Sequence, residues 1–303
     1  DPPSIAALSP PNGVSAGGYK VTVTGVNFGS PSTTIFAVVG GVLVQVGAHN
    51  DTWLTLDVPA GTGSLDIKLL VALQSSEVAS FIYDPPQLLT ISPSKGDAAG
   101  GYTMVLTGTS LGTGGTVKIG TLTCPLSGSG WQQNNITCTV PPGQGVNLGT
   151  YITVGTQVSN SLNFSYDLPY LYPVTPNTAV TDGGTLITIT GRNFGTGGVA
   201  TIGGVPCDVT VPPTLTSTNQ IICAVRPGQG VNLDVMVTSS AGVQSNTTKF
   251  SYLPPTISQP PNPSQFQTVG GGAVTITGTN YGLAASTYFT SPTGPRLCAP
   301  FGV

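Results

Sequence analysis

The residues that could perform acid–base or nucleophilic catalysis are sparse in this chain of 303 residues. His49 is its one histidine, so a Ser-His-Asp relay would depend on a single position beside Asn50 and Asp51. Asp57 and Asp66 could form a carboxylate pair, but they have no counterpart in the similar segments that follow. Acidic runs for calcium and His/Cys groups for zinc are missing from the sequence. We therefore expect no enzyme, no cofactor and no metal ion.

Four of the five cysteines form two pairs at similar spacing, Cys124 with Cys138 and Cys207 with Cys223. The first segment of the chain has Val44 and Leu56 at the corresponding positions, so both cysteines are missing together. Joint absence favours a disulfide, because half of a bridge has no function; the alternative is two independent buried thiols in each segment. A bridge that closes about fifteen residues contributes about 3 kcal/mol in the chain-entropy model. Disulfides indicate an oxidising, extracellular environment.

Cys298 has no partner in this sequence, because it matches the first cysteine of a pair and the chain ends at Val303. One expectation is that the sequence is a window on a longer array, with the partner beyond it. The other is that a neighbouring molecule completes the final half-domain, which would otherwise leave an open sheet edge.

Covalent sugar is the second kind of chemistry that the sequence allows. Four Asn-X-Ser/Thr sequons could carry N-linked glycans, at Asn50, Asn135, Asn163 and Asn246. The alternative at each site is an unmodified surface asparagine, because a chain rich in Ser and Thr contains sequons by chance. Asn262 is excluded by the proline that follows it. O-linked sugar is possible at Ser9, Pro10 and Pro11 if the prolines are hydroxylated.

The composition excludes several classes of partner. Charged residues make up 6% of the chain, and its eight Lys and Arg do not cluster as phosphate binding requires, so we expect no nucleic-acid partner. The longest apolar stretch, "FAVVGGVLVQVGA" from Phe36, is too short to span a bilayer and suits two strands around a Gly-Gly turn. We therefore expect no membrane insertion within this segment. So weakly charged a surface favours attached sugar or close association between copies.

The segments that must position these groups follow a fourfold repeat. The phrase "VTVTGVNFGS" at residues 21–30 returns as "MVLTGTSLGT", "ITITGRNFGT" and "VTITGTNYGL". Its central glycines lie 83, 83 and 87 residues apart, at Gly25, Gly108, Gly191 and Gly278. This period is too long for a solenoid unit and fits a small domain. We expect domains at 1–84, 85–167 and 168–253, followed by a partial domain at 254–303.

Each period is expected to be all-β. In "KVTVTG" the alternation puts Val21 and Val23 on one face of a strand. The equivalent inward pairs are Met104 and Leu106, Ile187 and Ile189, and Val274 and Ile276. Glycine after the strand and the Asn of "NFG" set a turn, and the aromatic residue of that triplet, such as Phe28, folds onto the sandwich. Short strands separated by such turn signals indicate an Ig-like β-sandwich.

The combined pattern is longer than any one strand and turn. It reads "PxIxxLSPxxGxxxGGxxVTVTGxNFG", then "C…VPPGQG" and "QxSNxxxFSY", and it resembles the IPT/TIG domain, an Ig-like module. The resemblance covers three complete periods and the first part of a fourth. It implies tandem Ig-like sandwiches arranged as beads on a string, a module of cell-surface receptors, large extracellular repeat proteins, some transcription factors and some starch-acting enzymes. The fold alone therefore does not decide the function.

Low charge, tandem repetition and the lack of reactive residues favour a structural role. We expect domains joined by a "YDPP" link in which proline restricts each joint, with Leu88 and Leu89 packing across it. The preferred hypothesis is a glycosylated subunit of an extracellular filament, sheath or surface appendage that self-associates into a polymer or array. The alternatives are the stalk of a cell-adhesion or receptor ectodomain and a carbohydrate-binding module. A carbohydrate platform needs exposed aromatic residues, and Trp53 and Trp131 are expected to be packing residues.

Overall fold

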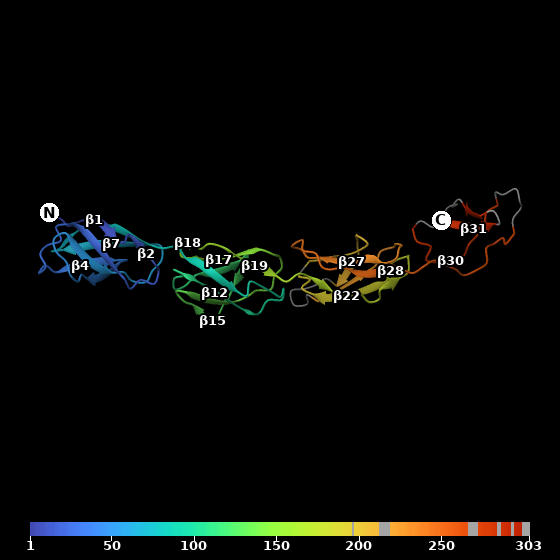
Figure 1. The fold of residues 1–303 in the computed structure, drawn as a ribbon, viewed down its shortest axis with the longest axis horizontal. Helices are drawn as coiled ribbons and strands as arrows, with labels where there is room; N and C mark the ends of the chain where they lie inside the picture. The colour runs from blue at the N-terminus through green and yellow to red at the C-terminus, as the bar shows by residue number, and fades with distance from the viewer. Residues whose placement is uncertain (196, 212–218, 266–271, 284–285, 292–293, 299–303) are drawn as a thin grey trace. The chain divides into compact units, whose positions relative to one another are not determined.

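Every element in the described part of the chain is a β-strand (Figure 1). The computed structural model describes residues 1–195, 197–211, 219–265, 272–283, 286–291 and 294–298, without the side chains of residues 129, 210–211, 287–291 and 294–298. The chain divides into two compact units, Asp1–Tyr166 and Asp167–Val303. The prediction of an all-β chain of Ig-like sandwiches is confirmed.

The first repeat consists of two sheets. One sheet has three strands in the order β1-β3-β6, and the other has six, in the order β2-β9-β7-β4-β5 with β8 paired to β7. The Gly-Gly turn predicted within the long apolar stretch joins β4 to β5, which are antiparallel. The strands are β1 (Ser4–Ser9), β2 (Asn12–Gly13), β3 (Lys20–Val26), β4 (Ile35–Val39), β5 (Val42–Gln45), β6 (Trp53–Asp57), β7 (Ser64–Val71), β8 (Gln74–Ser75) and β9 (Ala79–Tyr83).

The second repeat follows the same plan with one more strand in its smaller sheet. The two sheets have the orders β10-β12-β16-β15 and β11-β19-β17-β13-β14, with β18 paired to β17. The added strand β15 covers the edge that the first repeat leaves open at β6. The strands are β10 (Gln87–Ser92), β11 (Lys95–Gly96), β12 (Thr103–Thr109), β13 (Thr116–Ile119), β14 (Leu122–Cys124), β15 (Leu126–Trp131), β16 (Asn135–Thr139), β17 (Leu148–Val154), β18 (Gln157–Val158) and β19 (Leu162–Tyr166).

The second unit contains the third repeat and the start of a fourth. The third repeat has the sheet orders β20-β22-β26-β25 and β21-β28-β27-β23-β24, so it also has the added strand. Its strands are β20 (Tyr170–Leu171), β21 (Thr178–Ala179), β22 (Leu186–Arg192), β23 (Val199–Ile202), β24 (Val205–Pro206), β25 (Asp208–Val211), β26 (Gln220–Ala224), β27 (Leu233–Thr238) and β28 (Thr248–Tyr252). The fourth repeat has two strand pairs, β29 (Thr256–Ile257) with β30 (Gly278–Thr279) and β31 (Thr287–Ser291) with β32 (Gly294–Cys298).

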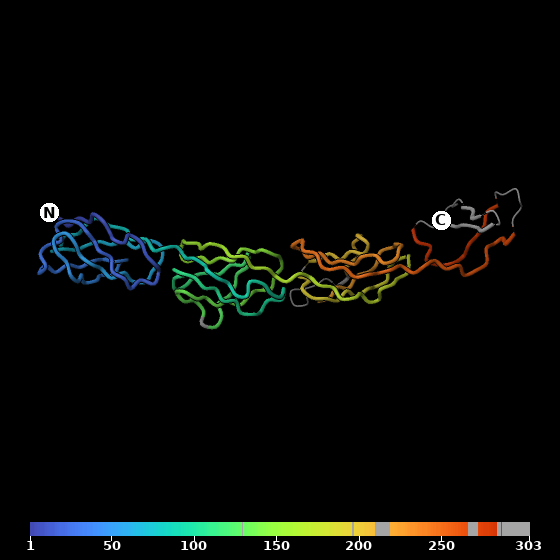
Figure 2. The backbone as a smooth tube through the Cα atoms, in the orientation of Figure 1, coloured from blue at the N-terminus to red at the C-terminus, as the bar shows by residue number. Residues whose placement is uncertain are grey.

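Alternation along the repeated strand decides which side chains enter each core. The predicted inward pairs are 0% exposed in the first three repeats, at Val21, Val23, Met104, Leu106, Ile187 and Ile189. Val274 and Ile276 of the fourth repeat are half-buried. The residue that follows in the turn phrase is also fully buried, as Phe28, Leu111 or Phe194. Each of the first three repeats therefore has its own hydrophobic core. Figure 2 traces the backbone that surrounds each of these cores.

A contact between tyrosine and glycine explains why the "VPxG" and "FSY" phrases recur together. The Tyr166 hydroxyl donates a hydrogen bond to the carbonyl oxygen of Pro141 at 2.7 Å. Its ring covers Gly143, where a Cβ atom would lie 2.5 Å from Cζ of the tyrosine, so glycine is required. Burial raises the pKa of Tyr166 far above its ordinary value, and the neighbouring Tyr102 adds to the shift. Equivalent bonds at 2.7 Å join Tyr83 to Pro59 and Tyr252 to Arg226.

Candidate functional site: the joint between consecutive repeats

The joint between the first and second repeats is built around one buried hydroxyl group. Ser15, in the loop between β2 and β3, is 0% exposed. Its Oγ donates a hydrogen bond to Oε1 of Gln133 at 2.7 Å and accepts one from N of Gly112 at 3.1 Å. The Ser15 backbone adds two longer bonds, because its N donates to Oγ of Ser110 at 3.4 Å and its O accepts from Nε2 of Gln133 at 3.4 Å. A buried hydroxyl that both donates and accepts across a domain boundary fixes the two domains against each other.

The repeated turn phrase positions the second-repeat side of this joint. Ser110 and Gly112 follow β12 with φ values of 54° and 68°. This left-handed conformation reverses the chain directly after the strand, and it presents N of Gly112 to Ser15. Asparagine, which tolerates positive φ better than most residues, takes the place of Ser110 in the other three repeats, as Asn27, Asn193 and Asn280. The repeated phrase therefore forms a turn and also supplies the groups that hydrogen-bond to the preceding repeat.

A glutamine makes the second connection across the same joint. Nε2 of Gln157, at the start of β18, donates to the carbonyl oxygen of Tyr83 at 3.0 Å. Its Oε1 accepts from N of Gly63 at 3.1 Å. One side-chain amide thereby pairs with two backbone groups of the first repeat. Together with Ser15, it holds the joint at two separate points.

The second unit has the same kind of joint between the third and fourth repeats. Thr181 takes the place of Ser15, and its Oγ1 accepts a hydrogen bond from N of Gly282 at 3.4 Å. Its own N donates to Oδ1 of Asn280 at 3.4 Å. Oε1 of Gln229 adds a bond from N of Leu283 at 2.9 Å. In both joints, therefore, a serine or threonine hydroxyl accepts a hydrogen bond from the backbone N–H of the turn glycine.

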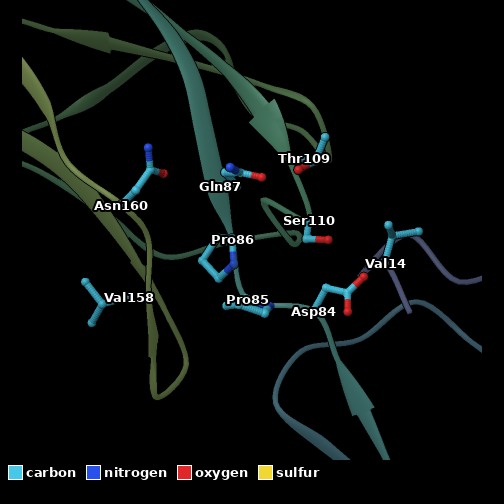
Figure 3. A pocket seen from close by; sticks show the side chains of 9 residues that line it. All are labelled: Val14, Asp84, Pro85, Pro86, Gln87, Thr109, Ser110, Val158 and Asn160. Carbon is cyan, nitrogen blue, oxygen red and sulfur yellow. The ribbon is translucent and has the colours of Figure 1, made fainter. Parts of the chain in front are cut away.

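A shallow cleft accompanies each of these joints. In the first unit a cleft of about 400 Å³ lies over the Pro85–Pro86 link, between Val14 and Asp84 on one side and Ser110 and Asn160 on the other (Figure 3). None of the nine described residues that line it is aromatic. In the second unit a cleft of about 310 Å³ lies over Pro254 and Pro255. Neither cleft holds a group of reactive side chains, so both are best described as parts of the joint.

The expectation that apolar side chains pack across the joint is wrong. Leu88 is 2% exposed and belongs to the core of the second repeat, whereas Leu89 is 57% exposed. Polar groups hold the joint instead, and the sequence pattern does not predict the roles of Ser15, Gln133 and Gln157. The one sequence signal for them is the hydroxyl residue that precedes the Gly-Gly pair in the first and third repeats.

The four paired cysteines form two disulfides. Cys124 of β14 bonds to Cys138 of β16, and Cys207, directly after β24, bonds to Cys223 of β26. Each bridge links the two sheets of its repeat, because β14 and β24 belong to the larger sheet and β16 and β26 to the smaller. Cys298 ends β32, and its side chain lies outside the described residues.

The four sequons lie in different structural settings. Asn163 on β19 is exposed, and Asn246 lies just before β28 with its amide bonded to Leu171. Asn50 caps a turn, because its Oδ1 accepts hydrogen bonds from N of Thr52 and N of Trp53, both at 2.9 Å. Asn135 begins β16 and is half-buried, with its Oδ1 shielded from solvent. The proposed O-glycan positions, Ser9, Pro10 and Pro11, are exposed.

The residues considered for catalysis are not brought together. Both ring nitrogens of His49 lie within hydrogen-bond distance of backbone carbonyls, those of Gly47 at 3.1 Å and Ser30 at 3.0 Å. Asp57 on β6 forms an ion pair with Lys20 at 2.8 Å. Asp66 lies on β7, in the other sheet, where it accepts a hydrogen bond from Ser80.

The two tryptophans occupy different strands. Trp131 ends β15, and its Nε1 donates to the carbonyl oxygen of Leu111 at 2.7 Å, as expected of a packing residue. Trp53 begins β6 and is 37% exposed, so it is only partly a packing residue. The register matches Trp53 to Asn135, because β3 pairs with β6 as β12 pairs with β16.

In the ranges that the structure describes, no three His, Cys, Asp or Glu side chains gather as a metal-binding group. Nor do these ranges contain a helix with the length and apolar character that crossing a bilayer requires.

Curated relatives align with a large part of this sequence. Human fibrocystin-L is 29% identical over 89% of the chain, and mouse plexin-A2 is 28% identical over 63% of it. The chain spans 6% and 11% of the lengths of these two relatives. Among solved structures, the full extracellular region of plexin A4 covers 84% of the chain, which in turn covers 34% of that structure, at 16% identity and a TM-score of 0.29.

The IPT/TIG domain model matches three consecutive segments, residues 3–83, 86–166 and 169–252. These segments make up most of the chain and contain both disulfides. Disulfides persist outside the reducing cytosol, so the extracellular location predicted from the cysteines is confirmed. The chain belongs to the IPT/TIG family of Ig-like domains.

Proposed function

We propose that this chain is a spacer segment in the ectodomain of a large cell-surface receptor or adhesion protein. The observation that carries the proposal is the joint at Ser15, which recurs at Thr181 in the second unit. Joints of this kind set the angle between consecutive domains, and a spacer depends on fixed angles more than on a pocket. The chain performs no catalysis in this role, and a recognition element lies elsewhere in the protein.

The similarity to much longer proteins supports this proposal. Fibrocystin-L and plexin-A2 contain many residues beyond the part that the chain matches. The low charge of the chain and the lack of a reactive cluster among its described residues are both compatible with a mechanical role. A protein in which one domain type is repeated with the same joint gains length without new chemistry.

Sedimentation velocity over a wide concentration range tests the spacer role. We expect the purified 303-residue chain to remain monomeric, because a spacer separates other elements and does not assemble by itself. Electron microscopy of the same material should show isolated particles. Concentration-dependent growth into ordered fibres would contradict the spacer role and support the second candidate.

The second candidate is the predicted filament or sheath subunit, and an open sheet edge in the first repeat favours it. The edge strand β5 has the sequence VLVQ, with no proline, cysteine or charge, and Leu43 is 57% exposed. The corresponding strands of the later repeats are shorter and lead into a disulfide, and a proline follows β14 (Pro125) or ends β24 (Pro206). Edges without such protection pair with other strands.

This edge is best suited to pairing with β5 of a second molecule. Antiparallel pairing of β5 with itself brings no like charges together, because all four residues are uncharged. On the outer face of the sheet, Leu43 pairs with Val38, so the apolar surface extends from the edge strand to β4 and ends at Lys68 of β7, which pairs with Val38 on its other side. In a filament, this contact would join neighbouring molecules.

Charge introduced at the edge separates the two candidates. Leu43→Lys should abolish any concentration-dependent assembly, because lysine blocks strand pairing at an edge. Thr123→Lys is the matched control, since Thr123 holds the same place on β14 beside a disulfide and should leave assembly unchanged. Assembly that persists in Leu43→Lys would contradict pairing through β5.

A further inference from the structure

We propose that Asn163 carries an N-linked glycan, and that the sequon at Asn246 remains unmodified in the folded protein. The two positions look alike in the sequence, because both lie shortly before an "FSY" phrase. In the structure they differ by three places relative to the closing strand: Asn163 directly precedes Phe164, whereas Asn246 lies four residues before Phe250. Their surroundings differ accordingly.

The strand neighbour of Asn163 leaves room for a sugar. Asn163 lies on β19 opposite Gly149 of β17, and it is exposed. The other repeats place a polar pair at this cross-strand position: Ser80 with Asp66 at 3.2 Å, and Lys249 with Asp234 at 2.6 Å. Because glycine has no side chain, the Asn163 amide has no hydrogen-bond partner among the described residues. Its Nδ2 is therefore available for modification without loss of a contact.

The amide of Asn246 is already used by the fold. Its Oδ1 accepts a hydrogen bond from N of Leu171 at 2.6 Å, and its Nδ2 donates to O of Leu171 at 3.1 Å. Asn160 makes the same two bonds to Leu88 in the second repeat, at 2.7 and 2.9 Å, although no sequon begins there. The asparagine is thus present for this pairing, whether or not a sequon surrounds it.

The pairing with Leu171 uses the edge of the amide that a sugar would occupy. N-glycosylation transfers an oligosaccharide from a lipid diphosphate donor: the C1–Nδ2 bond forms, the C1–O bond to phosphate breaks, and the amide loses one proton. A secondary amide favours the trans form, which places C1 on the same side as Oδ1. The hydrogen that bonds to O of Leu171 lies on that side. A glycan at Asn246 must therefore break this bond or adopt the unfavourable cis form.

Glycopeptide mass spectrometry of the 303-residue chain, secreted from a eukaryotic host and isolated as folded monomer, tests the proposal. We expect most molecules to carry a glycan at Asn163, with occupancy at Asn246 lower by about tenfold or more, given the cost of a cis secondary amide. Equal occupancy at the two sites, or an unmodified Asn163, would overturn the proposal. This measurement uses the wild-type protein, so it does not depend on the folding of a variant.

Two substitutions provide matched controls. Asn163→Gln removes the acceptor and should lower the intact mass by one glycan. Thr248→Ala destroys the sequon at Asn246 but leaves its amide in place, so the glycan mass should not change. A loss of glycan in Thr248→Ala, or an unchanged mass in Asn163→Gln, would also overturn the proposal.

Discussion

Val44 and Leu56 in the first repeat occupy the places that Cys124 and Cys138 hold in the second. Val44 pairs with Ala37 as Cys124 pairs with Val117, and Leu56 pairs with Val21 as Cys138 pairs with Met104. Apolar contact fills this place in the first repeat, where a covalent bond fills it in the second. The first repeat also lacks a strand equivalent to β15, which covers β16, and only an isolated bridge between His49 and Leu54 pairs with the outer edge of β6 among the described residues. One sandwich plan thus tolerates either a bridged, covered side or an apolar, open one.

Of the changes considered, reduction of the disulfides should have the largest effect on the difference in stability between the first repeat and the two bridged repeats. Each bridge closes a short loop, with sequence separations of 14 and 16 residues, and the chain-entropy model gives it about 3 kcal/mol. A reducing agent should therefore lower the free energy of unfolding of the second and third repeats and leave the first unchanged. Hydrogen exchange of buried amides in each repeat measures this directly. An equal loss of protection in all three repeats would contradict it.

The asparagine clamp, meaning the two hydrogen bonds that join Asn160 to Leu88 and the two that join Asn246 to Leu171, is expected to have the next largest effect on stability. Asn160→Ala and Asn246→Ala each leave the N–H of a buried leucine without its partner, at a cost of about 1–3 kcal/mol. The first repeat has exposed Glu77 at this place, so Glu77→Ala is the matched control and should change stability by less than about 0.5 kcal/mol. Denaturant unfolding of the three variants tests the clamp. A Glu77→Ala loss as large as the other two would refute it.

Ser15→Ala should have a smaller and more local effect. Loss of the hydroxyl removes the hydrogen bonds to Gln133 and Gly112, each of which contributes about 1 kcal/mol. We expect the Gly112 amide to exchange several-fold faster while the core amides of both repeats keep their protection. Ser9→Ala, at an exposed position, is the control. Unchanged exchange at Gly112 would show that the hydroxyl does not hold the joint.

The smallest effect is expected from alkaline pH. Burial raises the pKa of Tyr166 above its ordinary value of about 10, so the folded state favours the neutral phenol. The resulting stabilisation is complete below that value and is lost as the pH rises through the raised pKa. Denaturant unfolding from pH 8 to 11 should show stability falling above about pH 10, with a shallower fall in Tyr166→Phe. Equal slopes in the two proteins would contradict this assignment.

Local pattern was sufficient to predict the fold. Strand alternation placed Val21 and Val23 in the core because a sheet with one solvated face forces every second side chain inward. The disulfides were suggested by the paired absence of cysteine in the first repeat. The strand pattern lies within a single period and the cysteine pattern appears when the periods are aligned, so neither prediction needs contacts between distant parts of the fold.

The joint could not be predicted in the same way. Ser15 and Gln133 are 118 residues apart, and Gln157 and Tyr83 are 74 apart. Serine and glutamine are common on surfaces, so nothing in their type signals burial at a domain boundary. The sequons show the same limit: Asn163 and Asn246 look alike until the structure shows that one faces a glycine and the other pairs with the buried Leu171.

The distance between the first and second repeats is the most direct test of the central claim that Ser15 and Gln157 lock their joint. Spin labels at exposed Leu43 and Leu89, in the full chain with Cys298→Ser, allow pulsed electron paramagnetic resonance to measure it. The account predicts one narrow distance distribution that broadens in the double variant Ser15→Ala, Gln157→Ala. A broad distribution in the protein with both residues intact, or a narrow one that survives their loss, would contradict it.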